Sequence, residues 1–159
     1  MVKIKKDVGK TVEELTPEEL LKNTKEHIES VTSGLSFFSR MLLESGKNHD
    51  FTKLEYDEEF YDALVKGDLR TNDNNIWFQK HITEERHHLS NRVPDDVNLV
   101  DIFEYLVDCV MAGLARSGEV REVKIYDGVL QKAFQNTIEL LKINTEVSES
   151  NNVLDQFME

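Results

Sequence analysis

Histidines and aspartates are the residues of this chain with the clearest capacity for chemistry. The five histidines are His27, His49, His81, His87 and His88. Asp50 follows His49 directly, within a polar stretch that runs from Gly46 to Lys53. An imidazole nitrogen and a carboxylate oxygen are both good ligands for a divalent cation, so this adjacent pair is a candidate metal site. The plainer interpretation is that Asp50 caps the next helix and His49 is a solvated loop residue.

The stretch from His81 to His88 holds most of the remaining histidines. In a helix, His81 and His88 would share one face, with Glu84 between them. A solvated helix end would also explain them, because histidine is favourable near the negative end of the helix dipole. The density of this cluster favours ligands of a second metal, a general acid or a phosphate contact.

Asp108 lies within an apolar segment, where a carboxylate is costly to bury unless it is paired or binds a cation. Residues seven positions apart in a helix are separated by about 700°, so Asp101, Glu104 and Asp108 share one face. That face is either solvated or turned into a polar pocket. Asp101 and Glu104 lie nearer the helix start, where acids are favoured anyway, so Asp108 is the strongest candidate.

His27 is expected to point inward, because it lies four residues before Val31 on an apolar helical stripe. A core histidine with one hydrogen-bond partner is the plainer interpretation. Among the basic residues, Lys53 and Arg86 are the candidates for a substrate phosphate. The chain contains neither G-x-x-x-x-G-K-[ST] nor G-x-G-x-x-G, so a P-loop or a Rossmann site is not supported.

Helices must position these residues, since the chain shows helical periodicity and no convincing run of strands. Thr16 and Pro17 are typical of an N-cap and a first helical residue. Asn98 is expected to cap an apolar helix that ends near Gly118. The predicted helices cover about 16–45, 55–65, 76–88, 99–115 and 119–143, and the predicted loops about 46–53, 66–75 and 89–98. The fold class is therefore expected to be all-α, with an N-terminal extension at 1–15, a helical domain at 16–143 and an acidic C-terminal tail at 144–159.

The composition limits the classes of function. The 159 residues, 39% of them apolar, suffice for one domain with a hydrophobic core. No transmembrane segment or secretory signal is visible, and the single cysteine, Cys109, is expected to be a buried free thiol, so we expect a cytoplasmic protein without a membrane partner. The net charge of −12 argues against non-specific nucleic-acid binding but does not exclude a small phosphorylated substrate. An apolar face on the last helix would allow a homodimer.

The order of these residues, H…HD…H…HH…D, resembles the HD superfamily of metal-dependent phosphohydrolases over residues 16–143. The resemblance implies an HD-domain-like bundle of about five to six helices whose histidines and aspartates converge on metal. It implies His27, His49, Asp50 and Asp108 as the basic ligand set, with His81, His87 and His88 as further ligands. Lys53, in His-Asp-x-x-Lys, is similar to the HD-GYP phosphodiesterases, although a Gly-Tyr-Pro sequence is absent. The stretch from His81 to His88 is closer to small uncharacterised HD-like proteins of bacteria and phages, which implies a bacterial or phage-infected host cell.

The function that this resemblance implies is metal-dependent hydrolysis of a phosphate ester of a nucleotide or a similar small molecule. The cofactor would be one or two divalent ions of Mn, Fe, Co, Mg, Ni or Zn, which lower the pKa of bound water. Asp50 would bridge two metals or orient the water, Glu84 or His88 would protonate the leaving group, and Lys53 and Arg86 would neutralise phosphate charge. Two alternatives stay open. One is a non-catalytic protein of the same fold that binds a metal, a nucleotide or a partner protein; the other is a di-iron oxygenase, since the inositol oxygenases share a similar residue order.

Overall fold

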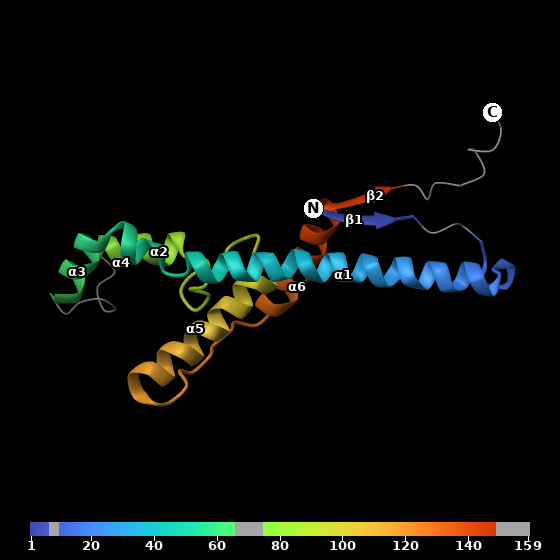
Figure 1. Ribbon diagram of the computed structural model, residues 1–159. Coiled ribbons are helices and arrows are strands. Elements are labelled where there is room, and N and C mark those ends of the chain that lie inside the picture. Colours follow the sequence, from blue (N-terminus) through green and yellow to red (C-terminus); the bar gives the residue numbers. More distant parts are fainter. Residues whose placement is uncertain (7–9, 66–74, 149–159) are drawn as a thin grey trace. The chain divides into compact units, whose positions relative to one another are not determined.

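The computed structural model describes residues 1–6, 10–65 and 75–148, and most of them are helical (Figure 1). The prediction of an all-α protein is confirmed. The chain divides into two compact units, one made of Met1–Arg40 with Glu139–Glu159 and the other of Met41–Ile138. Of the candidate site residues, only His27 lies in the first unit. No helix within the described ranges is both long enough and apolar enough to cross a membrane.

The first unit contains a strand pair that the sequence did not predict. β1 (Val2–Lys5) pairs in parallel with β2 (Thr145–Ser148), with Val2 opposite Thr145. The short 3₁₀ helix η1 (Val12–Glu14) precedes α1 (Pro17–Asn48). Two four-residue strands from opposite ends of the chain leave little local pattern, because their pairing depends on long-range contact.

α1 begins where the sequence predicts. The Thr16 hydroxyl accepts a hydrogen bond from the backbone N–H of Glu19, and the Glu19 side chain accepts one from the backbone of Thr16, which forms a capping box. No residue of α1 is fully buried, and its apolar stripe is exposed, including Leu20, Ile28 and Leu35. The expectation that this stripe points inward is therefore wrong for the single chain.

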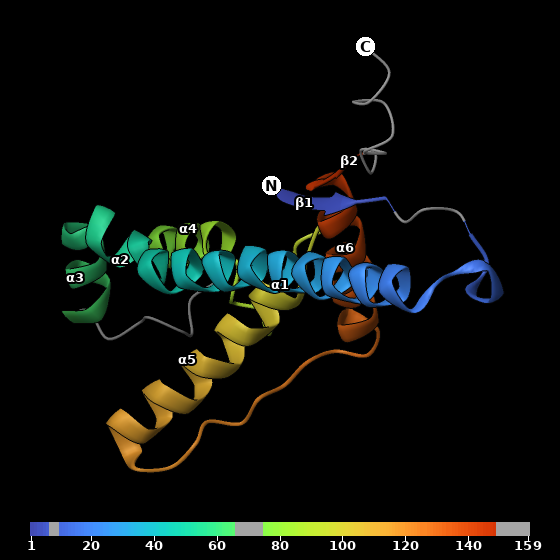
Figure 2. The same cartoon turned by 45° about the vertical axis from the view of Figure 1, so that its right-hand side comes forward.

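The second unit holds the short helices α2 (Phe51–Glu55), α3 (Asp57–Val65) and α4 (Ile76–Glu84), which contact one another beside the end of α1 (Figures 1 and 2). The predicted connection at 46–53 is instead the end of α1, a two-residue turn and the start of α2. The predicted loop at 66–75 lies outside the described residues except for Asn75, which caps α4 by accepting a hydrogen bond from Phe78. The prediction that this helix continues to His88 is wrong, because the chain leaves the helix at Glu85.

α5 (Leu99–Ser117) confirms the predicted apolar helix closely. Asn98 and Asp101 form a capping box, and Gly118 ends the helix with a φ of 74°. The next helix, α6 (Val129–Ile143), begins ten residues later than predicted. The segment between them is held by tertiary hydrogen bonds instead of helical ones: the Tyr105 hydroxyl accepts from the backbone N–H of Lys124 and donates to its carbonyl, each at 3.1 Å.

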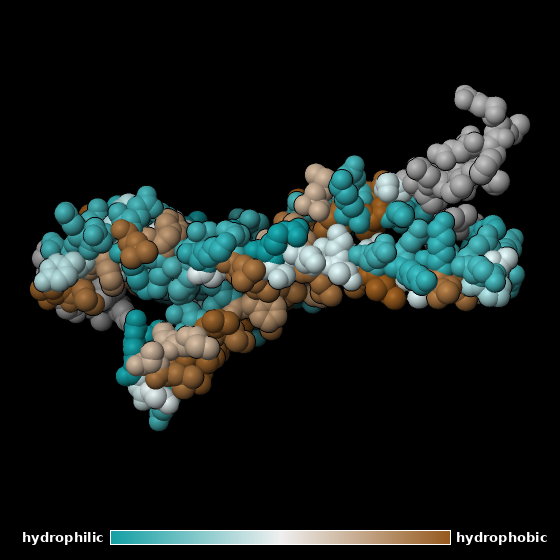
Figure 3. Space-filling view, viewed as in Figure 1, coloured by the Kyte–Doolittle hydropathy of each residue, from teal (hydrophilic) through white to brown (hydrophobic). Residues whose placement is uncertain are grey.

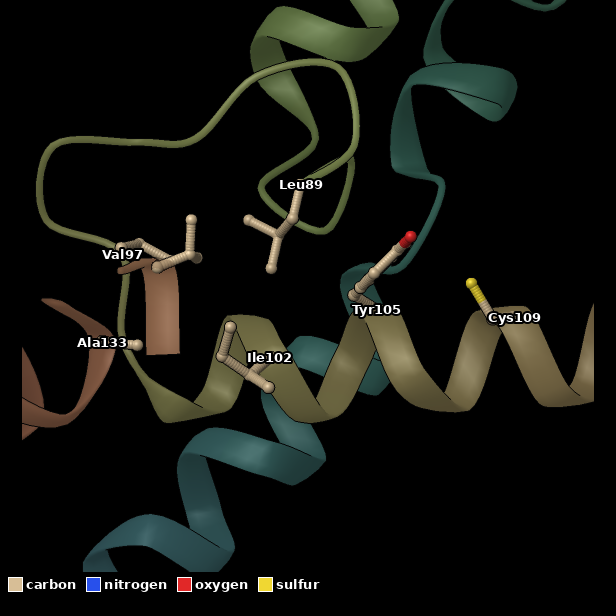
Figure 4. Close-up of a cluster of buried hydrophobic side chains, with 7 residues drawn as sticks. Leu89, Val97, Ile102, Tyr105, Cys109 and Ala133 are labelled. Carbon is tan, nitrogen blue, oxygen red and sulfur yellow. The ribbon is translucent and has the colours of Figure 1, made fainter. Parts of the chain in front are cut away.

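The core of the second unit lies along one face of α5. Ile102, Tyr105 and Cys109 point from this face toward Leu89 in the loop after α4, with Val97 and Ala133 beside them (Figure 4). The prediction that Cys109 is a buried free thiol is confirmed. The other side of α5 carries exposed apolar side chains, among them Phe103, Val107 and Met111 (Figure 3). One face of α5 therefore packs into the core of the unit. The first half of the same helix also carries the acidic residues of the site.

Candidate metal centre

The candidate centre begins at the break between α1 and α2, where His49 and Asp50 form the turn. Asp50 has a left-handed backbone, with φ 57° and ψ 26°, and is the one non-glycine residue with positive φ in the described part of the chain. Such a conformation costs about 1 to 3 kcal/mol, and aspartate tolerates it better than most residues. The Asp50 side chain makes no capping hydrogen bond, so the interpretation of Asp50 as a helix cap is not supported.

Three further histidines come from α4 and the turn that follows it. His81 lies in the last turn of α4, and His87 and His88 lie in the turn at 85–88. The ring centroid of His81 is 4.4 Å from that of His88 and 6.4 Å from that of His87. The change of chain direction at Glu85 brings these rings together, and the helical spacing assumed from the sequence does not.

α5 supplies Glu104 and Asp108, which lie four residues apart and therefore on one face of the helix. Asp101 was expected on the same face. It is instead 3% exposed, accepts the backbone N–H of Asn98 and binds the guanidinium of Arg86 through two hydrogen bonds of 2.8 Å. Asp101 therefore stabilises the start of α5, and Glu104 takes the place near the histidines.

Three imidazole Nε2 atoms surround the carboxylate of Asp50. His81 Nε2 and His87 Nε2 lie 3.6 Å and 3.7 Å from Oδ1 of Asp50. His49 Nε2 lies 3.5 Å from Oδ2 of Asp50 and 3.7 Å from Oδ1 of Asp108. Two ligands that each lie about 2.1 Å from one metal ion are about 3 to 3.6 Å apart. The observed spacings are close to those of shared ligands and too long for hydrogen bonds.

Glu104 contacts the Nδ1 atoms of two of these rings, whose Nε2 atoms face Asp50. The Nδ1 atoms of His49 and His87 each lie 3.0 Å from Oε1 of Glu104. The contact with His49 is a hydrogen bond, whereas the buried Nδ1 of His87 makes none within the described residues, because the ring is not aligned with the carboxylate. Ser45, near the end of α1, donates a hydrogen bond to the other Glu104 oxygen. With its Nδ1–H directed at Glu104, the His49 ring presents Nε2 to Asp50, as expected for a metal-ligating histidine with an orienting carboxylate. His87 also presents Nε2 to Asp50, and its Nδ1 lies within 3.0 Å of the same Glu104 oxygen.

His81 is oriented by Thr52 and Glu85. The Thr52 hydroxyl donates to Oε1 of Glu85 at 2.7 Å and lies 2.6 Å from Nδ1 of His81. Because its one proton goes to the carboxylate, the hydroxyl accepts from His81, which places the ring proton on Nδ1. The Nε2 atom of His81 then carries a lone pair, and it faces Asp50 and the Nε2 atom of His88, 2.7 Å away. Thr52 and His81 are 0% and 3% exposed, so this arrangement is fixed by packing.

The residues fit a divalent cation. Oδ1 of Asp50 is buried and accepts no hydrogen bond within the described ranges, although two imidazole nitrogens face it. A buried carboxylate oxygen of this kind requires a donor or a cation. The ligand atoms form two groups, each within 4.8 Å: His49, His87 and Glu104 in one, and Asp50, His81 and His88 in the other. Glu104 contacts the Nδ1 atoms of His49 and His87, so we assign it to orienting these rings. Asp50 faces their Nε2 atoms, so we assign it as the carboxylate ligand.

The local charges shift the pKa values of the histidines in opposite directions. The carboxylates of Asp108 and then Glu104 raise the pKa of His49 to about 10. Burial, with the charge of Lys53, lowers the pKa of His81 to about 4. Burial also lowers the pKa of His88 to about 3. His81 and His88 are therefore neutral near pH 7 and ready to bind a metal, whereas His49 must first lose a proton.

The carboxylates of the site stay ionised. Contact with His49 lowers the pKa of Asp108 to about 2. Burial by itself would raise the pKa of Asp50, but the adjacent Lys53 ammonium outweighs it and the pKa falls. Burial also opposes ionisation of Glu104, and the hydrogen bond from His49 is the first of several contacts that lower its pKa. Ionised carboxylates are the form that a cation requires.

Most of the residues predicted from sequence meet at this centre. His49, Asp50, His81, His87, His88 and Asp108 are brought together, and Lys53 donates a hydrogen bond to Asp50. His27 is not among them: it is exposed, lies near the middle of α1 in the other unit and belongs to neither ligand group. The expectation that His27 points inward is wrong, because the apolar stripe used to orient it is itself exposed.

Two other predicted residues lie away from the centre. Glu84 is exposed, and its carboxylate accepts a hydrogen bond from the Tyr56 hydroxyl at 3.4 Å. Arg86 is held by Asp101 and Asp96, so its guanidinium is already paired. The roles predicted for Glu84 as general acid and for Arg86 as phosphate ligand therefore gain no support from their positions.

A cavity of about 380 Å³ opens beside the centre. His81, His87, His88, Asp50 and Asp108 reach it from the candidate centre. Phe60, Trp77 and Phe78 add aromatic surface, and Lys53, Arg116 and Arg121 add positive charge. No local sequence pattern indicates a role for Thr52, Glu85, Arg116 or Arg121, and the position of Glu104 near the helix start favoured Asp108 over it. A substrate with both anionic and planar parts would suit this lining.

Protein-family models, curated proteins and solved structures were all compared with the chain, and none of them matches it.

Proposed function

We propose that the protein is a metal-dependent phosphohydrolase that acts on a phosphate ester of a nucleotide or a similar small molecule. The main support is the convergence of the Nε2 atoms of His49, His81 and His87 on the Asp50 carboxylate. This convergence lies beside a cavity that contains both cationic and aromatic side chains. The order of the residues, which resembles the HD superfamily, supports the same proposal without His27.

The ligands would be His49, Asp50, His81, His87, His88 and Asp108. A bound divalent cation supplies positive charge that polarises a phosphoryl oxygen and lowers the pKa of water. Glu104 and Thr52 hold the ligand rings in the required tautomers. The low pKa of His88 suits a neutral ligand better than a protonated general acid.

Lys53 supplies the proton for the leaving group in the proposed reaction, and Asp50 orients the attacking water. The water oxygen bonds to phosphorus, and its proton passes to bulk water. The ester P–O bond breaks, and the leaving oxygen takes a proton from the Lys53 ammonium, which lines the cavity and already donates to Asp50. Lys53 then recovers a proton from bulk water, which returns the site to its starting state.

Elemental analysis of the protein purified without chelator is the first test. We expect near-stoichiometric divalent metal in the natural sequence and its loss in both His49→Ala and Asp108→Ala. His27→Ala is the matched control, because it removes an exposed histidine outside both ligand groups and should leave the metal content unchanged. Protein without metal, even after reloading, would contradict the proposal.

A screen of phosphate esters with added Mn²⁺ then tests catalysis. Release of phosphate that disappears in Asp50→Asn would support hydrolysis. Stoichiometric metal without turnover of any substrate would favour the non-catalytic alternative. Iron with visible absorption and oxygen consumption would favour the oxygenase alternative.

A further inference from the structure

Arg121 enters the cavity from the segment that follows α5, and a glycine of α5 allows its approach. A Cβ atom added to Gly113 would lie 2.5 Å from the carbonyl oxygen of Glu119 and 2.6 Å from the backbone nitrogen of Arg121. The Arg121 N–H also donates to the carbonyl of Cys109 at 3.3 Å. The backbone of Arg121 is thus fixed directly against α5, one helical turn from Asp108.

Arg121 is half-buried, and its guanidinium makes no ion pair with any residue that the structure describes. Arg86 offers a direct contrast, since it pairs with two aspartates. Asp108 is the nearby carboxylate whose pKa responds to Arg121, and His49 contributes more to that shift. Arg121 therefore lines the cavity without a carboxylate in ion-pair contact, although the chain has a net charge of −12, and an anion in the cavity would supply that partner.

The cavity also presents a planar apolar wall. Trp77 is 5% exposed and stacks on His81 at 4.8 Å, and its ring is 4.7 Å from that of Phe60. The indole Nε1 is buried without a hydrogen-bond partner among the described residues. Phe78 lines the same cavity. A planar heteroaromatic group suits such a wall, because it can pack against Phe78 and can offer an acceptor to the indole N–H.

We infer that Arg121, with Arg116 at the edge of the cavity, binds a second phosphoryl group of the substrate, which is a nucleotide carrying at least two phosphoryl groups. This inference rests on the proposed function, because the first phosphoryl group is the one at the metal centre. Lys53 is already engaged with Asp50, so the two arginines supply the charge for the second group.

The binding of inorganic pyrophosphate and of inorganic phosphate tests this inference, with free Mn²⁺ kept in excess so that chelation does not strip the centre. Trp77 is the single tryptophan and lines the cavity, so its fluorescence reports binding. Arg121→Gln should weaken pyrophosphate binding about tenfold or more and phosphate binding less than about threefold. Lys124→Gln is the matched control, because it removes an exposed charge from the same segment outside the cavity, and it should change neither affinity. Arg121→Lys should recover part of the loss and would show that the charge, not the fold, is responsible.

Equal weakening of both anions in Arg121→Gln would overturn the inference, because Arg121 would then bind the first phosphoryl group. Unchanged pyrophosphate binding, or no pyrophosphate binding by the natural sequence, would overturn it as well. Failure of the proposed function gives a different result: pyrophosphate binding that depends on Arg121, without turnover of any nucleotide. Turnover of nucleoside diphosphates that is insensitive to Arg121 would leave the function standing and reject the role of Arg121.

Discussion

The Thr52 hydroxyl links His81 to Glu85: it lies 2.6 Å from Nδ1 of His81 and donates to the Glu85 carboxylate at 2.7 Å. Glu85 also accepts the backbone N–H of Thr52, at 2.9 Å. Thr52 lies two residues after Asp50. One short segment therefore supplies both a candidate ligand and the group that orients a second ligand from α4.

Thr52→Val tests this link, because valine keeps the shape of threonine and removes the hydroxyl. We expect metal affinity to fall about 10- to 100-fold, since His81 loses the partner that fixes its tautomer. The free energy of unfolding should fall by about 1 to 3 kcal/mol, because a buried ring N–H and a buried carboxylate both lose a partner. Chelator competition and denaturant titration measure the two effects. Thr52→Ser keeps the hydroxyl and should retain the metal affinity; equal losses in both variants would contradict the orienting role.

Glu104→Gln tests whether one carboxylate orients both His49 and His87. We expect the pKa of His49 to move down from about 10 toward its ordinary range and metal affinity to fall, because a neutral amide loses the charge that favours the His49 imidazolium and that faces Nδ1 of His87. NMR titration of the imidazole signals in metal-free protein measures the first effect. Asp101→Asn is the matched control, since it changes another buried carboxylate of α5. It should lower stability through the loss of Arg86 pairing and leave the pKa of His49 unchanged.

Local chemistry made much of this structure predictable. The caps at Thr16 and Asn98 and the stop at Gly118 are determined by residues within one turn, so α1 and α5 begin where the sequence indicates. His49 and Asp50 could be predicted as site residues, because they have the side-chain types that a metal site needs and lie at a predicted helix junction. The all-α class follows from the same periodicity.

Long-range contact explains what the sequence did not predict. Glu104 and Asp101 are equivalent by helical spacing, and only the position of Arg86 shows that Asp101 is already engaged. The helix predicted for 119–128 is absent because Tyr105 and Cys109 bind the backbone of that segment. The inward orientation predicted for His27 depended on the apolar stripe of α1, and this stripe is exposed in the structure.

The stability of the metal-free protein should depend on pH in both directions. The pKa of His49 is raised to about 10, so its contribution is complete below its ordinary pKa of about 6.5 and is lost as pH rises through about 10. The pKa values of His81 and His88 are lowered to about 4 and 3, so the unfolded chain binds more protons below pH 6.5 and stability falls on acidification. Thermal unfolding in chelator across this range should show a maximum near pH 6.5. His49→Gln should reduce the decline on the alkaline side and leave the acid side in place; the raised pKa values of Tyr105 and Cys109 account for the alkaline decline that remains.

Gly113→Ala tests the packing that fixes Arg121. The added methyl group would meet the backbone at Glu119 and Arg121 at 2.5 Å and 2.6 Å, and a backbone atom cannot move aside without displacing the segment. We expect the free energy of unfolding to fall by about 1 to 3 kcal/mol, although alanine is the better helix former. Gly34→Ala is the matched control: it lies inside α1 with no atom within 4 Å of the added Cβ, and it should raise stability by about 0.5 to 1 kcal/mol. Denaturant titration distinguishes the two signs. A gain in stability for Gly113→Ala would show that the 119–121 segment does not pack against α5 at this point, and the placement of Arg121 in the cavity would fail with it.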